Sequence, residues 1–427
     1  MKRFRILALG LVLAVLVTGV MAGCSAKKTT TTENDKNITL RTLRWAGAHA
    51  DYQAQLLGDY AKSKGIKVQQ DAIDYGQLFQ KIQLNMASGT AQYDLVWAQE
   101  IWMPSFIKSN YFKPLNDYIA AKVVPGFDAS IYNQNMLKIA EDSAGKIYGL
   151  PTYLQTPLLA YNKGMFASAG ITVPSDWTWQ NTLDVAKQFK AKGTGIAMPA
   201  KQGDPAAVDV FIAMARSNGA DYFDKNGKLN LTSDAFIAAG DYWGQLAKYS
   251  MEGSTTWHFD EVNKALQYGQ APFGLTASGI CGALEDKTNS TVAGKIGYAP
   301  LPYSQQVYGT MATWNWCVSA NSAHPKAAFE LAAWLTSQDT EKKQTIHNGQ
   351  ISALTSLFTD ATLVSQDPWL PAVGKALKNA NTEPLVDNST QLITAMEADL
   401  SAIATGQSTA KDAFTATQNQ LASQFNK

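Results

Sequence analysis

Apolar and polar residues alternate near the start of the chain in a way that predicts strands separated by helices. Residues 40–45 alternate with a period of two, as expected for a strand, and residues 66–73 and 93–97 read as two more. Apolar residues at helical spacing fill both gaps, over residues 51–64 and residues 78–89. This strand–helix–strand–helix–strand order predicts parallel strands covered by helices.

Glycine and proline divide the stretch from residue 145 to residue 179 into short elements. Residues 146–151 read as a strand closed by a proline, and residues 158–161 read as a second, buried strand. A short helix starts at residues 162–163. It ends near Gly170, because glycine adopts the left-handed conformation of a helix C-cap at little cost.

The rest of the chain is predicted to be largely helical, with two further strands. Residues 180–275 are mostly helical, and strands follow at residues 295–302 and 313–319. Helices are predicted at residues 327–336 and 410–425. The pattern indicates an α/β protein, and 427 residues leave room for two lobes, each with its own core.

The N-terminus has the pattern of a processed segment. Three cations precede an apolar run over residues 6–20, which is short for a membrane span. Residues 21–24 resemble the bacterial lipobox, in which small residues precede a cysteine that is lipidated. We therefore predict a signal peptide over residues 1–23 and a lipidated Cys24, with a plain secretory signal or a signal anchor as alternatives. The lipidated cysteine and a polar, flexible linker make up residues 24–37.

This N-terminal pattern predicts an extracytoplasmic protein that is anchored to the cell membrane by lipid. The pattern is compatible with the outer face of the cytoplasmic membrane and with a periplasm. Acyl chains on Cys24 are sufficient for stable anchoring when two or more are attached.

Composition narrows the class of partner. Removal of residues 1–23 leaves 33 Lys and Arg against 35 Asp and Glu, a net charge of −2. This near-neutral balance argues against a nucleic-acid partner, which needs a basic face, and favours a neutral ligand. Cys281 and Cys317 remain after Cys24 is lipidated. We predict two buried free thiols, although an exported protein can also form a disulfide.

Catalytic motifs are not recognisable in the sequence. The four histidines are scattered without metal-ligand spacing, and neither a nucleophile elbow nor a phosphate-binding loop is present. We expect no metal and no cofactor. Isolated acids can still meet in space as a glycosidase pair, which keeps an enzyme acting on glycans as an alternative. The acids considered for such a pair are Glu100, Asp204, Asp209 and Asp260.

Several sequence pieces in a fixed order resemble family 1 of the bacterial extracellular solute-binding proteins, in particular its carbohydrate-binding branch. Residues 145–151 match a G-K-x-Y-G-L-P run, and residues 161–163 match the Y-N-K that follows a strand. Residues 169–170 and 174–177 match the next two pieces, A-G and Pro-x-x-W. Together with later pieces, the resemblance covers about residues 40–425.

The resemblance implies a two-lobe, type II periplasmic-binding-protein-like fold. Each lobe is expected to be a mostly parallel sheet flanked by helices, and a hinge of several crossings joins them. The implied lobes are residues 38–153 plus 320–353 and residues 154–319 plus 354–427. The implied crossings lie near residues 154–158, 316–319 and 352–356.

Aromatic residues give the clearest sign of a ligand site. The chain has 11 tryptophans, and a sugar needs flat aromatic plates against its C–H faces and amides or carboxylates around its hydroxyl rim. Ligands of open α/β sheets bind beyond the carboxyl ends of strands. Strand ends, the hinge and the second lobe give the candidates Trp45, His49, Gln99, Glu100, Trp102, Tyr153, Gln155, Asp209, Trp257, Ser278, Trp314, Trp316 and Gln350.

Some of these candidates have a second interpretation. Trp45, Trp314 and Trp316 are also typical of core residues, and His49 can serve to start a helix. Residues 280–281 are Ile-Cys, where the family commonly has an aromatic plate after a small-residue turn. A maltose-type pocket is therefore not carried over to this chain.

The resemblance implies a monomeric binding protein that delivers a neutral carbohydrate or sugar alcohol to an ABC permease in the membrane. No bond is made or broken in this role. The alternatives are the secreted lipoprotein enzyme acting on glycans and the ligand-binding component of a membrane sensor.

Overall fold

The computed structural model describes residues 37–46, 49–203, 205–386 and 388–425. The predicted signal peptide, Cys24 and the linker up to residue 36 lie outside the described residues. Within these ranges, no helix is both long enough and apolar enough to cross a membrane.

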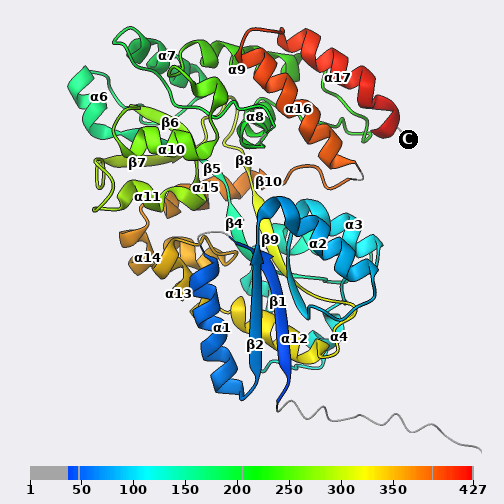
Figure 1. Ribbon diagram of the computed structural model, residues 1–427. Coiled ribbons are helices and arrows are strands. Elements are labelled where there is room, and N and C mark those ends of the chain that lie inside the picture. Colours follow the sequence, from blue (N-terminus) through cyan, green and yellow to red (C-terminus); the bar gives the residue numbers. More distant parts are fainter. Residues whose placement is uncertain (1–36, 47–48, 204, 387, 426–427) are drawn as a thin grey trace, which may run out of the picture. The chain divides into compact units, whose positions relative to one another are not determined.

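A mixed five-stranded sheet contains the predicted N-terminal strands. Its order is β2 (Lys67–Ile73), β1 (Thr39–Trp45), β3 (Leu95–Gln99), β9 (Ala312–Val318) and β4 (Leu150–Gln155). The strand β1 is parallel to both of its neighbours, whereas β9 is antiparallel to β3 and to β4 (Figure 1). Apolar residues of these strands and of their covering helices form one large core.

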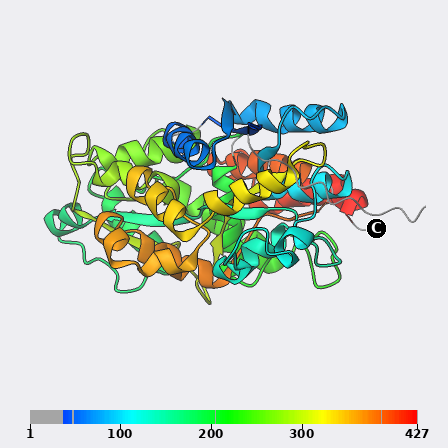
Figure 2. The same ribbon diagram turned by 90° about the horizontal axis from the view of Figure 1, so that it is seen from below.

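Helices connect and flank these strands. The helix α1 (Ala50–Lys64) ends at Gly65, whose φ of 67° is the left-handed conformation that glycine adopts easily. Tyr52 of α1 stacks on His347 of α13 (Gln338–Asn348) with ring centroids 3.7 Å apart, so these helices lie side by side (Figures 1 and 2). The other helices around this core are α2 (Tyr75–Ala87), η1 (Glu100–Trp102), α3 (Met103–Lys108), α4 (Asn116–Ala120), η2 (Ala129–Ile131), α5 (Gln134–Ile139) and α12 (Pro325–Leu335).

A three-stranded sheet organises the second group of elements. Its central strand, β5 (Pro157–Asn162), is antiparallel to β6 (Phe273–Ala277) and to β7 (Ile296–Pro300). This pairing differs from the mostly parallel sheet expected for the second lobe. The helices of this part are α6 (Lys163–Ala169), α7 (Trp179–Lys190), α8 (Ala206–Ser217), α9 (Asp234–Lys248), η3 (Ser254–Thr256), α10 (Phe259–Gln267), η4 (Ser278–Ile280), α11 (Gly282–Glu285), α16 (Ser389–Ala404) and α17 (Ala410–Phe425).

The chain passes between the two sheets at Thr156, between β4 and β5. The backbone N–H of Thr156 donates to Oγ of Ser278 at 3.0 Å, and the N–H of Ser278 donates to the carbonyl of Thr156 at 2.9 Å. This reciprocal pair fastens the crossing to the end of β6.

The strand β9 corrects the expected position of the second crossing. Residues 312–318 were assigned to the C-terminal lobe, but β9 pairs along its length with β3 and β4. The chain therefore enters the five-stranded sheet after the short strand β8 (Gly309–Thr310), which pairs with β10 (Ala380–Asn381). The expected lobe boundaries were too late here because sequence patterns identify a strand but not its partners.

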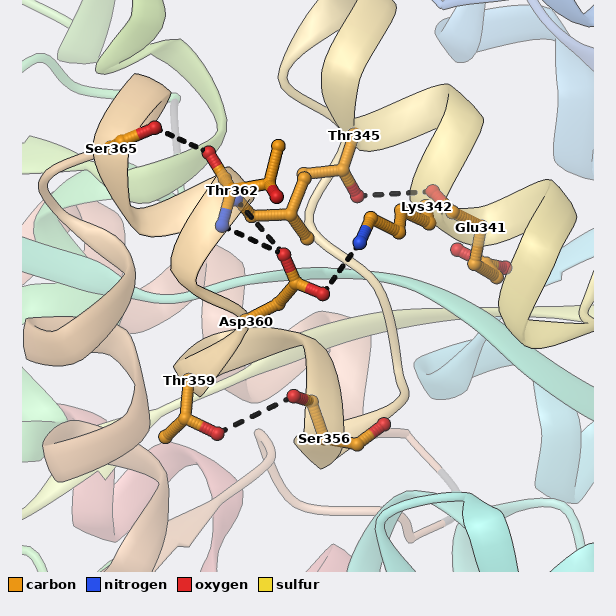
Figure 3. A network of polar contacts seen from close by, with 9 residues as sticks. Glu341, Lys342, Thr345, Ser356, Thr359, Asp360, Thr362 and Ser365 are labelled. Carbon is orange, nitrogen blue, oxygen red and sulfur yellow. Dashed lines mark hydrogen bonds and ion pairs between the residues drawn. The ribbon is translucent and has the colours of Figure 1, made fainter.

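Residues beyond α13 form a helical connection. It consists of η5 (Thr355–Thr359), α14 (Ala361–Gln366), α15 (Leu370–Ala376) and η6 (Leu377–Asn379). Asp360 caps α14 by accepting from the N–H groups of Thr362 and Leu363, at 3.0 and 3.2 Å. Lys342 of α13 donates to the same carboxylate at 2.6 Å (Figure 3). One side chain thus caps α14 and ties it to α13.

Both cysteines of the described chain are buried free thiols, as predicted. Cys317 lies in β9 and Cys281 precedes α11.

Candidate ligand-binding site

Tryptophans from three strand ends meet at one edge of the five-stranded sheet. Trp97 and Trp314 stack with centroids 4.5 Å apart, and Trp45 lies 6.0 Å from Trp314 at an interplanar angle of 17°. Trp102 meets Trp314 edge-on at 5.4 Å. Gln99 is the cross-strand partner of Trp314, so its half-buried side chain lies beside the cluster. The structure thus brings together four predicted residues: Trp45, Gln99, Trp102 and Trp314.

Exposure separates the members of this tryptophan cluster. Trp45 is only half-buried and keeps an accessible surface. Trp316 stacks on Trp97 at 6.0 Å, and both side chains are 0 % exposed. Trp102 and Trp314 are 7 % and 4 % exposed. Complete burial favours a packing role for Trp316, which holds Trp97 and, through it, Trp314.

A buried arginine supports the cluster from within the sheet. The guanidinium carbon of Arg44 lies 4.3 Å from the centroid of the Trp97 ring, a cation–π contact. Nη1 donates to Oε1 of Gln53 at 2.6 Å and Nε donates to the carbonyl of Trp45 at 3.0 Å, while Nη2 has no partner among the described residues. Burial lowers the pKa of Arg44 to about 9. Arg44 was not predicted, because a charged residue in an alternating strand normally faces solvent.

His49 lies beside the cluster as a neutral imidazole. It is buried, and its ring is 5.5 Å from that of Tyr153. Burial, reinforced by the Arg44 charge, lowers the pKa of His49 to about 4. His49 occupies the N-cap position of α1, but its side chain makes no capping bond. His49 therefore starts α1 through its backbone alone, and its side chain takes no part in capping this helix.

Glu100 places a carboxyl group next to Trp102. It is 2 % exposed, and its Oε2 accepts the backbone N–H of Thr313 at 2.7 Å. Burial raises the pKa of Glu100 to about 8. The protonated form is therefore substantially populated near neutral pH.

The predicted hinge residues Tyr153 and Gln155 contact each other on β4. Oη of Tyr153 donates to Oε1 of Gln155 at 3.0 Å and packs against Gly279 of η4, which follows β6. The hydroxyl oxygen of Ser278 already accepts the N–H of Thr156. Ser278 therefore has a structural partner at the crossing.

The remaining predicted residues lie in other surroundings. Trp257 is half-buried against the small core around Val262, and its carbonyl accepts the N–H groups of Ala200 and Lys201. The carbonyl of Asp209, on α8, accepts the hydroxyl of Thr310 at 2.9 Å. Gln350 follows α13, is 0 % exposed, and accepts the hydroxyl of Thr345 on its carbonyl.

A second buried acid was missed by the sequence interpretation. Glu383 follows β10 and is 7 % exposed. Arg216 of α8 donates through Nη1 to the carbonyl of Thr382 at 3.1 Å and through Nε to Asp221 at 3.1 Å. Burial raises the pKa of Glu383 to about 7, against the opposing effect of Arg216. A single acid in a polar loop has no sequence pattern that could have singled it out.

Over the ranges that the structure covers, no three His, Cys, Asp or Glu side chains are grouped so that they could hold a metal ion.

The sequence of this chain is that of a bacterial extracellular solute-binding protein. The sequence model described as "Bacterial extracellular solute-binding protein" matches residues 46–342, and the chain belongs to this family. Among curated proteins, the chain is 28% identical over 342 residues to a probable amino-acid ABC transporter periplasmic-binding protein of Sinorhizobium fredii, covering 78% of this chain and 77% of that one. It is 24% identical over 307 residues to a mannitol-binding protein of Pseudomonas aeruginosa, covering 66% and 70%.

Solved structures confirm the fold class predicted from the sequence. An ABC transporter solute-binding protein of Agrobacterium radiobacter in complex with ribitol aligns at a TM-score of 0.78 with 21% identity, covering 92% of this chain and all of that one. A maltose-bound protein of T. maritima aligns at 0.78 with 22% identity, covering 90% and 99%. The chain therefore has the two-lobe, type II periplasmic-binding-protein fold.

Proposed function

We propose that this chain is the solute-binding component of an ABC importer and that it captures a neutral carbohydrate or sugar alcohol between its two lobes. The observation that carries this proposal is the tryptophan cluster, in which the rings of Trp45 and Trp102 meet that of Trp314. The carboxyl group of Glu100 accepts the backbone N–H of Thr313, the residue before Trp314. Sugar and polyol recognition needs this combination of apolar plates and hydrogen-bond acceptors. Relatives with carbohydrate or polyol ligands in their names, among them the mannitol-binding protein, support it.

Calorimetric titration of residues 38–427 tests the ligand class. The panel contains D-mannitol, ribitol, maltose, arabino-oligosaccharides, monosaccharides and amino acids. We expect one sugar or polyol to bind. Trp314→Ala should weaken the binding of that ligand by at least about 30-fold. This factor corresponds to a loss of ~2 kcal/mol of binding free energy at a buried aromatic anchor.

Two further variants make the result interpretable. Trp45→Ala removes a half-buried ring of the same cluster, with less effect on the core than Trp314→Ala. Trp334→Ala removes a half-buried tryptophan of α12 that packs on Tyr60 instead, and it should leave affinity unchanged. Unchanged affinity in both cluster variants would exclude the tryptophans as ligand plates.

An amino acid is the second candidate ligand. Two observations favour it: the name of the Sinorhizobium relative and the buried Arg44, whose Nη2 lacks a partner in the described part of the chain. A guanidinium N–H is a strong donor to a ligand carboxylate. Binding of amino acids alone in the same titration would establish this candidate and exclude the carbohydrate.

The proposed role involves binding without turnover. Incubation with nitrophenyl glycosides and oligosaccharides should release no product, since we assign Glu100 to ligand binding. Release of reducing ends that is lost in Glu100→Gln would instead establish the glycan-hydrolysing alternative.

Lipid attachment at Cys24 is part of the same proposal. Cells fed a labelled fatty acid should label the full chain, and Cys24→Ala should abolish the label and release the protein from the membrane. Retention of the label in that variant would contradict the anchor. A permease partner is tested by ligand uptake, which should stop when the gene for this chain is deleted.

A further inference from the structure

The tryptophan cluster continues beyond Trp102 onto a further aromatic ring. Phe79 of α2 meets Trp102 with ring centroids 5.6 Å apart and an interplanar angle of 61°. Trp102 in turn meets Trp314 at 5.4 Å, and Trp314 meets Trp45 at 6.0 Å. Four rings thus form a chain of contacts that leads from Trp45, at the end of β1, to Phe79 on α2.

The two ends of this chain of rings keep an accessible surface. Trp314 and Trp102, in the middle, are buried, whereas Trp45 and Phe79 are only half-buried. A sugar unit packs its apolar C–H face on an accessible aromatic ring. Two accessible rings that are separated by two buried ones therefore offer such a surface to two different sugar units.

A cavity adjoins the Phe79 end of the chain of rings. It measures 630 Å³, within the range of small-ligand sites, and both Phe79 and Trp102 line it. Residues of η1 and α3 supply a further part of its lining, and residues 388–391, around the start of α16, supply another. Because Trp102 also contacts Trp314, this cavity is continuous with the tryptophan cluster.

The polar side chains of this cavity are almost all uncharged. They are Ser105, Ser109, Asn388, Ser389, Thr390 and Gln391. Lys108 is the single charged side chain among the described residues that line the cavity. Hydroxyl and amide groups both donate and accept hydrogen bonds, as the hydroxyl rim of a sugar requires. The lining therefore matches a neutral, hydroxylated ligand better than a strongly charged one.

Two of these polar groups have hydrogen-bonding capacity left for a ligand. The hydroxyl of Ser105 donates to the carbonyl of Trp102 at 2.9 Å, which leaves its oxygen available as an acceptor. Asn388 is the N-cap residue of α16, but its side chain makes no capping bond. Within the described part of the chain, its amide therefore remains available as both donor and acceptor.

We propose that this cavity is a second subsite of the ligand site and that the ligand is an oligosaccharide, with one sugar unit on Trp45 and a further unit on Phe79. The inference rests on the proposed function and narrows its ligand class. A monosaccharide or a short polyol covers one of the two accessible rings, whereas an oligosaccharide reaches both. The second subsite therefore adds binding free energy only for the longer ligands.

Calorimetric titration of residues 38–427 with sugars of increasing length tests the inference. One series is glucose, maltose and maltotriose, and the other is arabinose, arabinobiose and arabinotriose, with D-mannitol and ribitol as short polyols. We expect one trisaccharide to bind at least about 10-fold more tightly than its monosaccharide, a gain of ~1.4 kcal/mol in binding free energy.

Three variants assign this gain to the cavity. Phe79→Ala should remove most of the advantage of the trisaccharide and leave the affinity for the monosaccharide unchanged. Thr390→Val exchanges a hydroxyl for a methyl group and should weaken the trisaccharide about 3- to 10-fold, as expected for one lost hydrogen bond. Phe127→Ala is the matched control, because Phe127 is also half-buried on the same core but packs on Tyr132 and Phe329.

The outcomes separate the inference from the function on which it rests. Failure of the wild type to bind any sugar or polyol overturns both. Binding of a monosaccharide or polyol without any gain for longer sugars overturns the inference alone. A gain with length that both Phe79→Ala and Thr390→Val retain also overturns it, since the further units then bind elsewhere. If Phe79→Ala fails to fold, Thr390→Val, which changes an exposed side chain, decides the same question.

Discussion

Tyr153 and Gly279 touch where β4 passes into β5. A Cβ atom at Gly279 would overlap Oη of Tyr153 and would lie 3.1 Å from Oε1 of Gln155. Glycine is needed there for space, because η4, which follows β6, approaches the phenol directly. The contact joins the two sheets at the residues that the sequence suggested for the hinge.

The first prediction at the residue scale concerns this contact. Gly279→Ala should destabilise the protein by about 1–3 kcal/mol, the usual range for overpacking a filled site. The measurement is the free energy of unfolding by denaturant. Gly282→Ala is the matched control, since its nearest neighbouring atom would be 3.7 Å away in Trp369. Adding Tyr153→Phe to Gly279→Ala removes the obstructing oxygen and should recover most of the lost stability. If the double variant is no more stable than Gly279→Ala, the clash lies elsewhere.

Single residues differ in how far the sequence could predict them. Trp45, Glu100 and Trp102 were named as candidates because they lie at or after strand ends, and ligand sites lie beyond the carboxyl ends of strands. Arg44 and Glu383 were not found. Arg44 faces a buried tryptophan although its strand alternates, and the segment that carries Glu383 is held by Arg216, which donates to the carbonyl of Thr382. Such contacts exist only in the folded chain.

At the scale of elements, the link between α13 and α14 depends on Asp360 (Figure 3). Its hydrogen bond to Lys342 and those to the N–H groups of α14 lower the pKa of this carboxyl. Asp360→Ala should therefore lower the melting temperature through loss of both the cap and the ion pair. Lys342→Met removes only the ion pair, whose partners are partly exposed, and should lower it less.

Calorimetry at low and high salt tests this assignment. The effect of Lys342→Met should shrink at 1 M salt, while that of Asp360→Ala should persist in part, since hydrogen bonds of a cap are little screened. Equal effects of the two variants at both salt concentrations would contradict a capping role.

The elements also show where sequence patterns stop being informative. Helix α6 lies within one residue of its predicted ends, because Asn162 and Gly170 are local signals for capping. The strand predicted at residues 146–151 was placed about four residues too early, since a proline was taken as its end. In the structure β4 runs from Leu150 to Gln155 with Pro151 inside it. Proline is tolerated there because β4 is the edge strand of the sheet.

For the whole molecule, buried acids predict how stability depends on pH. Burial raises the pKa of Glu341 to about 8, of Asp367 to about 7 and of Asp399 to about 6. Each acid stabilises the folded protein fully below its pKa in the unfolded chain, which is near 4. This contribution is lost as pH rises through its pKa in the folded protein. His49 acts in the opposite direction, because its pKa is about 4 in the folded protein and near 6.5 in the unfolded chain. The unfolded chain therefore gains the proton first, and stability falls as pH drops below 6.5.

We therefore expect the melting temperature to be highest near pH 5–6 and to fall toward pH 8.5. Scanning calorimetry across this range measures it. Glu341→Gln should reduce the loss of stability toward pH 8.5. The reduction should be on the order of 1 kcal/mol for each unit by which burial raises the pKa of Glu341. The amide still accepts the hydroxyl of Thr152, which donates to Glu341 at 2.5 Å. A melting temperature that rises steadily from pH 5.5 to pH 8.5 would show that these acids do not govern stability.

The position of β9 in the sheet determines when the first core can fold during synthesis of the chain. β9 lies between β3 and β4, yet it is translated about 220 residues after β3. At ~5–20 residues per second, a ribosome needs roughly 10–40 s to supply this missing strand. During that time β3 and β4 have no partner between them, and the first core stays open. This strand order therefore delays completion of the first core until β9 has been synthesised.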